Sequence, residues 1–266
     1  MTGADFNLGA RVVILTGGAG ILGTRMAMAL VMHGARVAVV DRDRARLDKA
    51  LAAISAPSDV CRAFEADITD RASLELLRDE IESLWAPVEV LANNAAFKSE
   101  NFFAPFEDFP LADWNEVFAV NLTAAMLACQ VFGSGMARRG RGSIINTLSI
   151  YGVAAPDQRI YEGSLYEGRA INTPAVYSAS KAGLWGLTKY LSSYWGGAGV
   201  RVNAITPGGV FSGQNDTFVA RYSARVPMGR MAEQDEMSGA LVFLASDASS
   251  YMTGQNIVVD GGLTVW

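Results

Sequence analysis

Residues 11–41, RVVILTGGAGILGTRMAMALVMHGARVAVVD, contain the clearest indication of the architecture. The run RVVILT is apolar enough for a buried strand, and a glycine-rich turn joins it to a stretch of helical periodicity at 21–33. A second apolar strand, ARVAVVD, then ends at Asp41. A strand, a helix and another strand in this order predict neighbouring parallel strands with the helix packed on one face of the sheet.

The same alternation continues to the end of the chain. Five more strand-like runs follow, VCRAFEAD, VEVLANN, GSIINTLS, VRVNAITP and NIVVDGG, which brings the number to seven. Further helices are expected at 43–54, 70–84, 110–137, 174–196 and 233–246. Since no linker or repeat divides the chain, we predict one α/β domain over residues 1–266, built on a doubly wound, seven-stranded parallel sheet.

Composition and charge argue against several classes of partner. The 22 basic and 27 acidic residues form no basic patch suited to nucleic acid or an anionic membrane. No apolar run approaches the roughly eighteen residues that cross a bilayer, and the N-terminus shows no secretory leader. We therefore expect a cytoplasmic protein with a small-molecule substrate and neither nucleic-acid nor membrane partners.

The cysteines and the histidine give no sign of metal or triad chemistry. Cys61 and Cys129 form no close-spaced ligand pattern, so we expect free buried thiols and no metal site. The only histidine, His33, precedes Gly34 at the end of a helical stretch, which favours a role at the helix C-terminus. A histidine-based catalytic triad is therefore not expected. The basic run at 138–141 ends a helix, where cations suit the helix dipole.

The glycine-rich turn GGAGILG, residues 17–23, lies where backbone N–H groups can bind a pyrophosphate. Asp41 follows Gly23 by 18 residues, at the end of the next strand, where a carboxylate would bind ribose hydroxyls and repel a 2′-phosphate. No basic residue occurs at 16–20, so NAD is favoured, and Arg42 beside Asp41 keeps NADP as the less favoured alternative. A tight strand-to-helix turn without a ligand is the structural alternative.

Tyr177 and Lys181 lie four residues apart in TPAVYSASKAGLWGLTKYL, so their side chains project from one helix face. Thr173 is expected to cap this helix and Pro174 to occupy its first position. A charge about 5 Å from the phenol would stabilise the phenolate by roughly 3 kcal/mol and lower its pKa by roughly 2 units. A phenol near neutrality suits a general acid or base. An unrelated surface tyrosine and lysine are the alternative.

Taken together, the motifs resemble those of the short-chain dehydrogenase/reductase family over essentially the whole chain. The matching segments, in order, are TGGAGILG, Asp67 with Ile68, NNAA at 93–96, VNL around Asn121, INTLS around Ser149, YSASK around Tyr177, PGGV at 207–210 with Ser212, and TGQNIVVDGG. The resemblance implies a Rossmann fold and hydride transfer at a carbon that bears a hydroxyl.

The resemblance also implies roles for individual residues. Tyr177 would exchange the proton of the substrate hydroxyl, Ser149 would hold its oxygen, and Lys181 would bind the nicotinamide ribose while tuning Tyr177. Asn121 would hold a water that links Lys181 to solvent. Judged alone, Ser149 is also compatible with a capping residue and Asn121 with an ordinary polar helix residue. The expected cofactor contacts are Gly17, Gly20, Ile21, Leu22, Gly23, Asp41, Asp67, Ile68, Asn93, Ala95, Tyr177, Lys181, Pro207, Gly208, Val210 and Ser212.

Three departures from the family pattern are visible. Ile21 stands where the single-domain branch usually has a glycine, as in the extended, sugar-nucleotide-modifying branch, and Ala96 replaces another glycine. Ser149 and Tyr177 are 28 residues apart, which implies an insert of about fifteen residues within about 153–173. We expect this insert to be a substrate loop, with Tyr151 and Arg159 as substrate contacts. A solvated loop or a subunit contact is the alternative.

These observations favour an NAD-dependent oxidoreductase that interconverts a secondary alcohol and a ketone on a polar, sugar-like or polyol substrate. A sugar-nucleotide epimerase or dehydratase with bound NAD is an alternative, although only 89 residues follow Tyr177 to form its extra lobe. An NADP-dependent carbonyl reductase and a protein that has lost catalysis are further alternatives. The resemblance implies a homo-oligomer, a tetramer or dimer built on the helices at 110–137 and 174–196.

Overall fold

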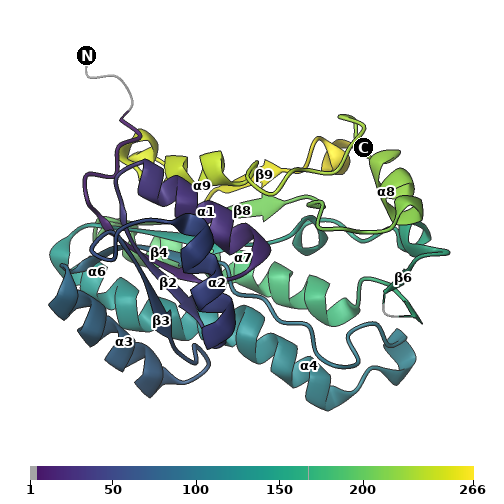
Figure 1. The fold of residues 1–266 in the computed structure, drawn as a ribbon, viewed down its shortest axis with the longest axis horizontal. Coiled ribbons are helices and arrows are strands. Elements are labelled where there is room, and N and C mark those ends of the chain that lie inside the picture. Colours follow the sequence, from purple (N-terminus) through teal and green to yellow (C-terminus); the bar gives the residue numbers. More distant parts are fainter. Residues whose placement is uncertain (1–4, 167) are drawn as a thin grey trace.

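Seven parallel strands form the sheet of the computed structural model, which describes residues 5–166 and 168–266. The order across the sheet is β3-β2-β1-β4-β5-β8-β9, so the chain starts at the centre and winds outward in both directions (Figure 1). This confirms the predicted doubly wound α/β fold. The strands are β1 (Val12–Thr16), β2 (Arg36–Asp41), β3 (Cys61–Glu65), β4 (Val88–Asn93), β5 (Gly142–Thr147), β8 (Val200–Pro207) and β9 (Asn256–Val259).

Helices cover both faces because successive side chains of a strand point to opposite sides. In β1, Val13 and Leu15 join the core under α1 (Ile21–Met32), α2 (Arg44–Ile54) and α9 (Ser238–Ala245). Val12 and Ile14 join the opposite core, under α3 (Arg71–Leu84), the helical segment that ends in α6 (Ser134–Arg139), and α7 (Ala175–Gly196). A strand buried on both faces explains why RVVILT is apolar throughout.

The predicted helix at 110–137 is a long, irregular helical segment. It runs through α4 (Leu111–Phe118), a π-helical turn (Ala119–Thr123), α5 (Ala124–Ala128), a second π-helical turn (Cys129–Gly133) and α6. Among the described residues, only Leu111–Arg139 is long and apolar enough to cross a membrane by length and composition, with a mean hydropathy of 1.6. Half of that window is buried inside the fold, against the sheet and α7, so we attribute its apolar character to core packing.

The chain departs from the sequence-based expectation at several helix ends. The predicted helix at 233–246 begins only at Ser238, and a short helix that was not predicted, α8 (Asp216–Ser223), follows β8. Thr173 does not cap α7: Pro174 is the N-cap residue, and the Thr173 hydroxyl contacts the Tyr161 hydroxyl instead. His33 does end α1, where its Nδ1 lies 2.8 Å from the Ala29 carbonyl.

The insert between β5 and α7 is folded. It contains a 3-10 helix (Gln158–Tyr161) and a two-stranded antiparallel hairpin of β6 (Leu165–Tyr166) and β7 (Arg169–Ala170); Glu167 of the insert lies outside the described residues. Ile160 packs with Phe218 and Tyr222 of α8 in a small core of their own. The insert and α8 therefore form one structural unit at the end of the molecule towards which the strands run (Figure 1).

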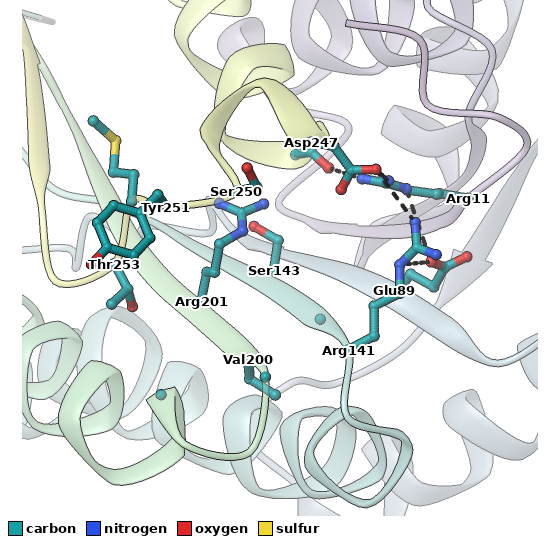
Figure 2. Close-up of a pocket in the computed structure, with 15 residues that line it drawn as sticks. Arg11, Glu89, Arg141, Ser143, Val200, Arg201, Asp247, Ser250, Tyr251 and Thr253 are labelled. Atoms are coloured by element: carbon teal, nitrogen blue, oxygen red, sulfur yellow. Dashed lines mark hydrogen bonds and ion pairs between the residues drawn. The ribbon is translucent and has the colours of Figure 1, made fainter. Parts of the chain in front are cut away.

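A cavity of about 540 Å³ lies at the opposite edge, where the strands begin (Figure 2). Arg11 donates to the Ala245 carbonyl at 2.8 Å and pairs with Asp247 at 2.5 Å, while Arg141 pairs with Glu89 at 3.1 Å. Arg201 donates to the last carbonyls of α9 and to a nearby hydroxyl. These arginines neutralise the C-terminal end of α9 and bind it to the sheet, so this cavity has a structural explanation.

Candidate functional site

The glycine turn can pack closely against its neighbours only because it lacks side chains. Gly17 adopts a φ of +62°, and a Cβ there would lie 2.7 Å from Ala95. At Gly23, a Cβ would lie 2.3 Å from the Gly17 carbonyl oxygen, so this glycine lets α1 start directly against β1. The turn is held from the other side by Asn94, whose Nδ2 donates to the Gly17 carbonyl at 3.2 Å. The site of the predicted pyrophosphate loop is thus a rigid backbone cradle.

The first turn of α1 can bind an anion. Its N-cap residue is Gly20, which supplies no side-chain hydrogen bond, and no acidic residue lies in the first turn. The first N–H groups of a helix lack intrahelical partners and carry a partial positive charge, which suits a phosphate. Ile21 begins this turn with a side chain that is 53 % exposed, and Leu22 packs against the core beside it. The chemistry of a dinucleotide pyrophosphate fits these residues.

Asp41 lies at the carboxyl end of β2, next to the glycine turn. Its Oδ1 accepts from the main-chain N–H groups of Arg42 at 2.9 Å and Asp43 at 3.4 Å, which fixes the orientation of the carboxylate. The guanidinium carbon of Arg42 lies 5.1 Å from the centre of the Phe97 ring. The carboxylate of Asp41, which is expected to bind ribose hydroxyls, is therefore present at the end of β2. The neighbouring cation of Arg42 lies near the Phe97 ring.

The other expected cofactor contacts follow the ends of β3 and β4. Asp67 accepts from both the N–H and the hydroxyl of Thr69, and these bonds hold its pKa below the usual value. Ile68 packs against the core beside α3. The side chain of Asn93 is buried and donates to the Asn146 side chain at 2.9 Å, so a cofactor would meet this residue only through its main chain. The expectation that Asn93 contacts the cofactor stays a prediction.

Ser149, Tyr177 and Lys181 converge although 28 residues separate the first two. Ser149 follows β5, and its hydroxyl lies near enough to the Tyr177 phenol to lower the pKa of that phenol. The Lys181 Nζ lies 5.9 Å from the centre of the Tyr177 ring and donates to the Thr147 carbonyl at 2.8 Å. The insert does not interrupt this arrangement because it folds outside the sheet and returns the chain to α7.

The pKa of Tyr177 differs from the expectation. Burial raises the pKa of this phenol, the Ser149 hydrogen bond opposes that rise, and the Tyr161 phenol adds to it. Burial also lowers the pKa of Lys181 to about 8. The sequence-based prediction counted the charge of the lysine and omitted the desolvation of both groups, so it had the wrong sign for the protein alone.

Asn121 lies in the first π-helical turn and is 1 % exposed. Its Oδ1 accepts from the Phe97 N–H at 2.9 Å, and its Nδ2 donates to the Ser180 hydroxyl at 3.2 Å. The amide therefore joins the loop after β4 to α7, one residue before Lys181. The bond to Ser180 uses one of the two side-chain amide hydrogens, which leaves the other for the predicted water.

The loop after β8 closes the opposite side of the site. Gly208 and Gly209 pass so close to Asp260 and Tyr222 that a Cβ would lie within 2.8 Å of either neighbour, and the Gly209 N–H donates to the Tyr222 hydroxyl. Pro207 ends β8, and Val210 forms a single bridge with Ala232. Ser212 is exposed and lies at the rim, hydrogen-bonded to Gln214.

These loops enclose a cleft of about 670 Å³. Tyr151 lines it together with Ser149 and Tyr177, which places it where a substrate contact is expected. Arg159 does not line it: this side chain is 80 % exposed and makes two 2.8 Å bonds to Asp157. The prediction of Arg159 as a substrate contact is therefore not supported by its position, because the 3-10 helix that carries it points it away from the cleft.

Sequence reasoning missed several cleft residues. Lys98, whose pKa is lowered by burial, comes from the loop after β4, and Asn172 from the end of the insert. Asn172 donates to the Phe103 carbonyl at 3.0 Å, and its buried Oδ1 has no hydrogen-bond partner. Gln214, Asn215 and Phe218 come from the segment around α8. Only the rule that ligands bind at the carboxyl ends of parallel strands pointed to these loops.

Comparison with known proteins shows the family to which the chain belongs. A family model described as enoyl-(acyl carrier protein) reductase matches residues 18–264. D-threitol dehydrogenase of Mycolicibacterium smegmatis is 34 % identical over 266 residues, which cover 98 % of this chain and 95 % of the relative. The chain belongs to the short-chain dehydrogenase/reductase family. Galactitol 2-dehydrogenase (L-tagatose-forming) of Cereibacter sphaeroides is also 34 % identical, over 98 % of both chains.

Solved structures agree with the fold of this short-chain dehydrogenase. A short-chain dehydrogenase from Leptospira borgpetersenii with bound NAD+ is 33 % identical, with a TM-score of 0.85 over 99 % of this chain and 96 % of that one. A gluconate 5-dehydrogenase from Burkholderia cenocepacia, in complex with NADP and tartrate, is 28 % identical, with a TM-score of 0.85 over 99 % and 98 %. The chain is thus an NAD(P)-dependent oxidoreductase that acts on CH–OH groups.

Proposed function

We propose that this enzyme uses NAD to oxidise a secondary hydroxyl of a polyol or related sugar derivative to a ketone. The observation that carries the proposal is that Ser149 and Tyr177 line the same cleft, with the ammonium of Lys181 5.9 Å from the centre of the Tyr177 ring. The D-threitol and galactitol dehydrogenases support a polyol substrate, and the hydroxyl and amide side chains in the cleft wall, such as Tyr151, Thr173 and Asn172, support it independently.

Oxidation of a secondary alcohol removes a proton from oxygen and a hydride from carbon. We assign the proton to Tyr177, with Ser149 donating to the substrate oxygen and holding it in place. A bound oxidised nicotinamide supplies the hydride acceptor. Lys181 stabilises the phenolate of Tyr177 by its charge, and Asn121 fixes the position of α7 through its bond to Ser180.

NAD rather than NADP is proposed because Asp41 presents a fixed carboxylate at the end of β2. A carboxylate accepts from ribose hydroxyls and repels a phosphate at the same place. The Leptospira relative binds NAD+, whereas the Burkholderia relative was solved with NADP, so the family alone does not decide between the cofactors. NADP-dependent carbonyl reduction remains the competing function.

The epimerase and dehydratase alternative is not favoured. It rested on Ile21 in the glycine turn, whose side chain is exposed at the start of α1. The chain covers 95 % and 98 % of the two polyol dehydrogenases to which it is similar, and the described residues contain no additional lobe for a nucleotide.

The insert at 153–173 is proposed to act as a substrate loop. A homotetramer or dimer, a cytoplasmic location and the absence of nucleic-acid and membrane partners stay predictions.

A substrate panel tests the function. Purified enzyme is assayed with NAD and, separately, with NADP against threitol, galactitol, glycerol, gluconate, tartrate and simple secondary alcohols, by the absorbance of the reduced cofactor. We expect the highest kcat/KM with NAD and a neutral polyol. Preference for apolar secondary alcohols would contradict the polyol assignment, and preference for NADP would contradict the cofactor assignment.

A further inference from the structure

Three hydroxyl groups form a chain along the wall of the cleft. The Tyr161 hydroxyl donates to the Tyr151 hydroxyl at 3.0 Å and lies 2.5 Å from the hydroxyl of Thr173. All three side chains line the cleft that contains Ser149 and Tyr177. Tyr161 and Thr173 belong to the insert, whereas Tyr151 lies before it, in a 3-10 helix (Ile150–Gly152) that follows β5. The insert therefore brings two hydroxyl groups to the cleft, in addition to Leu165, Ile171 and Asn172.

The direction of this row of hydrogen bonds follows from the role of Tyr161 as donor to Tyr151, together with a count of hydrogens. Each hydroxyl has one hydrogen to donate. Tyr161 gives its hydrogen to Tyr151, so the short contact between Tyr161 and Thr173 uses the hydrogen of Thr173. The chain runs from Thr173 through Tyr161 to Tyr151. The hydrogen of the Tyr151 hydroxyl is the one that the chain does not use.

Tyr151 is held beside the catalytic groups. Its main-chain N–H donates to the Ser149 hydroxyl oxygen at 3.2 Å. The backbone of Tyr151 is therefore fixed next to the hydroxyl that is proposed to hold the reacting oxygen. Burial is the main reason why the pKa values of Tyr151 and Tyr161 are raised, and both phenols therefore keep their hydrogens at ordinary pH. The Phe218 ring of α8, 5.5 Å from the Tyr161 ring, limits the movement of Tyr161.

We propose that Tyr151 donates a hydrogen bond to a second hydroxyl of the polyol substrate, and that Tyr161 and Thr173 of the insert orient its hydrogen for this purpose. This inference rests on the proposed function and extends it to substrate choice. Hydrogen bonds in a chain polarise one another, so the two insert residues also strengthen the final donor. Tyr151 is a binding residue, and Tyr161 is a positioning residue that acts through it.

Through Tyr161 and Thr173 the insert would influence the choice of substrate, although its Arg159 does not contact the substrate. That arginine pairs with Asp157, which caps the 3-10 helix carrying Tyr161. Arg225, in the segment after α8, pairs with the same carboxylate. The charged residues of the insert thus anchor it to that segment, and its hydroxyl residues reach the cleft.

A double-mutant cycle with two kinds of substrate tests the proposal. The kcat and KM of the wild type, Tyr151→Phe, Tyr161→Phe and the double variant are measured with NAD on threitol and on 2-butanol, which has no second hydroxyl. We expect Tyr151→Phe to lower the threitol-to-butanol ratio of kcat/KM by about tenfold, mainly through the KM for threitol. Tyr161→Phe should lower the ratio by a smaller factor, and the double variant should match Tyr151→Phe.

Two controls distinguish an effect of the hydrogen-bonded hydroxyl groups from an effect of side-chain packing. Thr173→Ser keeps a hydroxyl and should retain the wild-type ratio, whereas Thr173→Val removes it and should resemble Tyr161→Phe. Tyr190→Phe changes an exposed phenol on α7, outside the cleft, and should leave both substrates unaffected. A thermal melt of each variant shows that it is folded.

The outcomes are distinct. An unchanged ratio in Tyr151→Phe, or losses of Tyr151→Phe and Tyr161→Phe that multiply in the double variant, would overturn the proposed chain while leaving the polyol function standing. A wild type that oxidises 2-butanol and no polyol would overturn the proposed function and the inference together. Equal losses on both alcohols would show that Tyr151 and Tyr161 only maintain the structure.

Discussion

The ammonium of Lys181 lies 5.9 Å from the centre of the Tyr177 ring, one turn along α7, and burial lowers the pKa of this lysine to about 8. A lysine with a lower pKa in the folded protein than in the unfolded chain reduces stability at low pH, because folding then buries its charge. Between about pH 8 and 10.5 the unfolded chain retains a proton that the folded protein has lost, so stability rises with pH across this range.

Lys181→Met removes this titration. We therefore expect the stability of the wild type relative to Lys181→Met to increase between pH 8 and 10.5, by at most about 3 kcal/mol. Denaturant unfolding of both proteins at several pH values measures the difference, and subtraction cancels the titration of all other groups. A difference that does not change with pH would show that the lysine keeps its ordinary pKa.

Tyr177→Phe deletes the exchangeable proton and preserves the ring, which packs edge-on against Phe102 at 6.1 Å. Turnover should fall by about 10²–10⁴, the usual contribution of a general acid or base, while NAD still binds. Stopped-flow turnover and a fluorescence titration with NADH distinguish the two effects. Tyr194→Phe, on the exposed face of the same helix, is the matched control. Retention of more than about a tenth of the turnover would rule out the assigned role.

Asp41→Ala should narrow the preference for NAD over NADP. Charged hydrogen bonds contribute about 1.5–3 kcal/mol, so the ratio of the two dissociation constants should change by about ten- to a hundredfold. Asp43→Ala is the control, because it removes the same charge two residues away, where the side chain caps α2. Calorimetric titration with each cofactor gives the ratio. Similar changes in both variants would mean that general charge, and not the position of Asp41, sets the preference.

Gly23→Ala should abolish cofactor binding and lower the melting temperature, because its Cβ would lie 2.3 Å from the Gly17 carbonyl oxygen and force α1 away from β1. Gly186→Ala is the contrasting change. A Cβ at this position of α7 meets nothing within 4 Å, so alanine should stabilise the helix by about 0.5–1 kcal/mol. Normal NAD binding by Gly23→Ala would contradict the close packing of the turn.

Arg159→Ala should leave kcat/KM for the best polyol within about twofold, because exposed ion pairs contribute little and the side chain does not line the cleft. Asp157→Ala should raise KM and lower the melting temperature, since its carboxylate binds Arg159 and Arg225 and caps the 3-10 helix. Steady-state kinetics and thermal melts of both variants check this. A large rise in KM for Arg159→Ala would restore it as a substrate contact.

The sequence by itself determined the parts that depend on local patterns. Apolar runs predicted all seven strands of the large sheet, and helical periodicity predicted most helices, because burial on one or both faces of an element leaves a regular pattern in the sequence. The two short strands of the insert were not predicted. The glycine turn and the four-residue spacing of Tyr177 and Lys181 were likewise visible, since each requirement is met within one turn or one helix.

Only the tertiary structure determined the properties that depend on distant contacts and on burial, namely pKa values and side-chain directions. The raised pKa of Tyr177 follows from desolvation by residues far along the chain, which no local spacing encodes. Distant contacts also determine the positions of two other side chains. Thr173 contacts the Tyr161 hydroxyl and does not cap α7, and Arg159 pairs with Asp157 outside the cleft. In an insert without periodic pattern, side-chain direction is set by the surface on which it packs, here α8, and that surface exists only after the chain has folded.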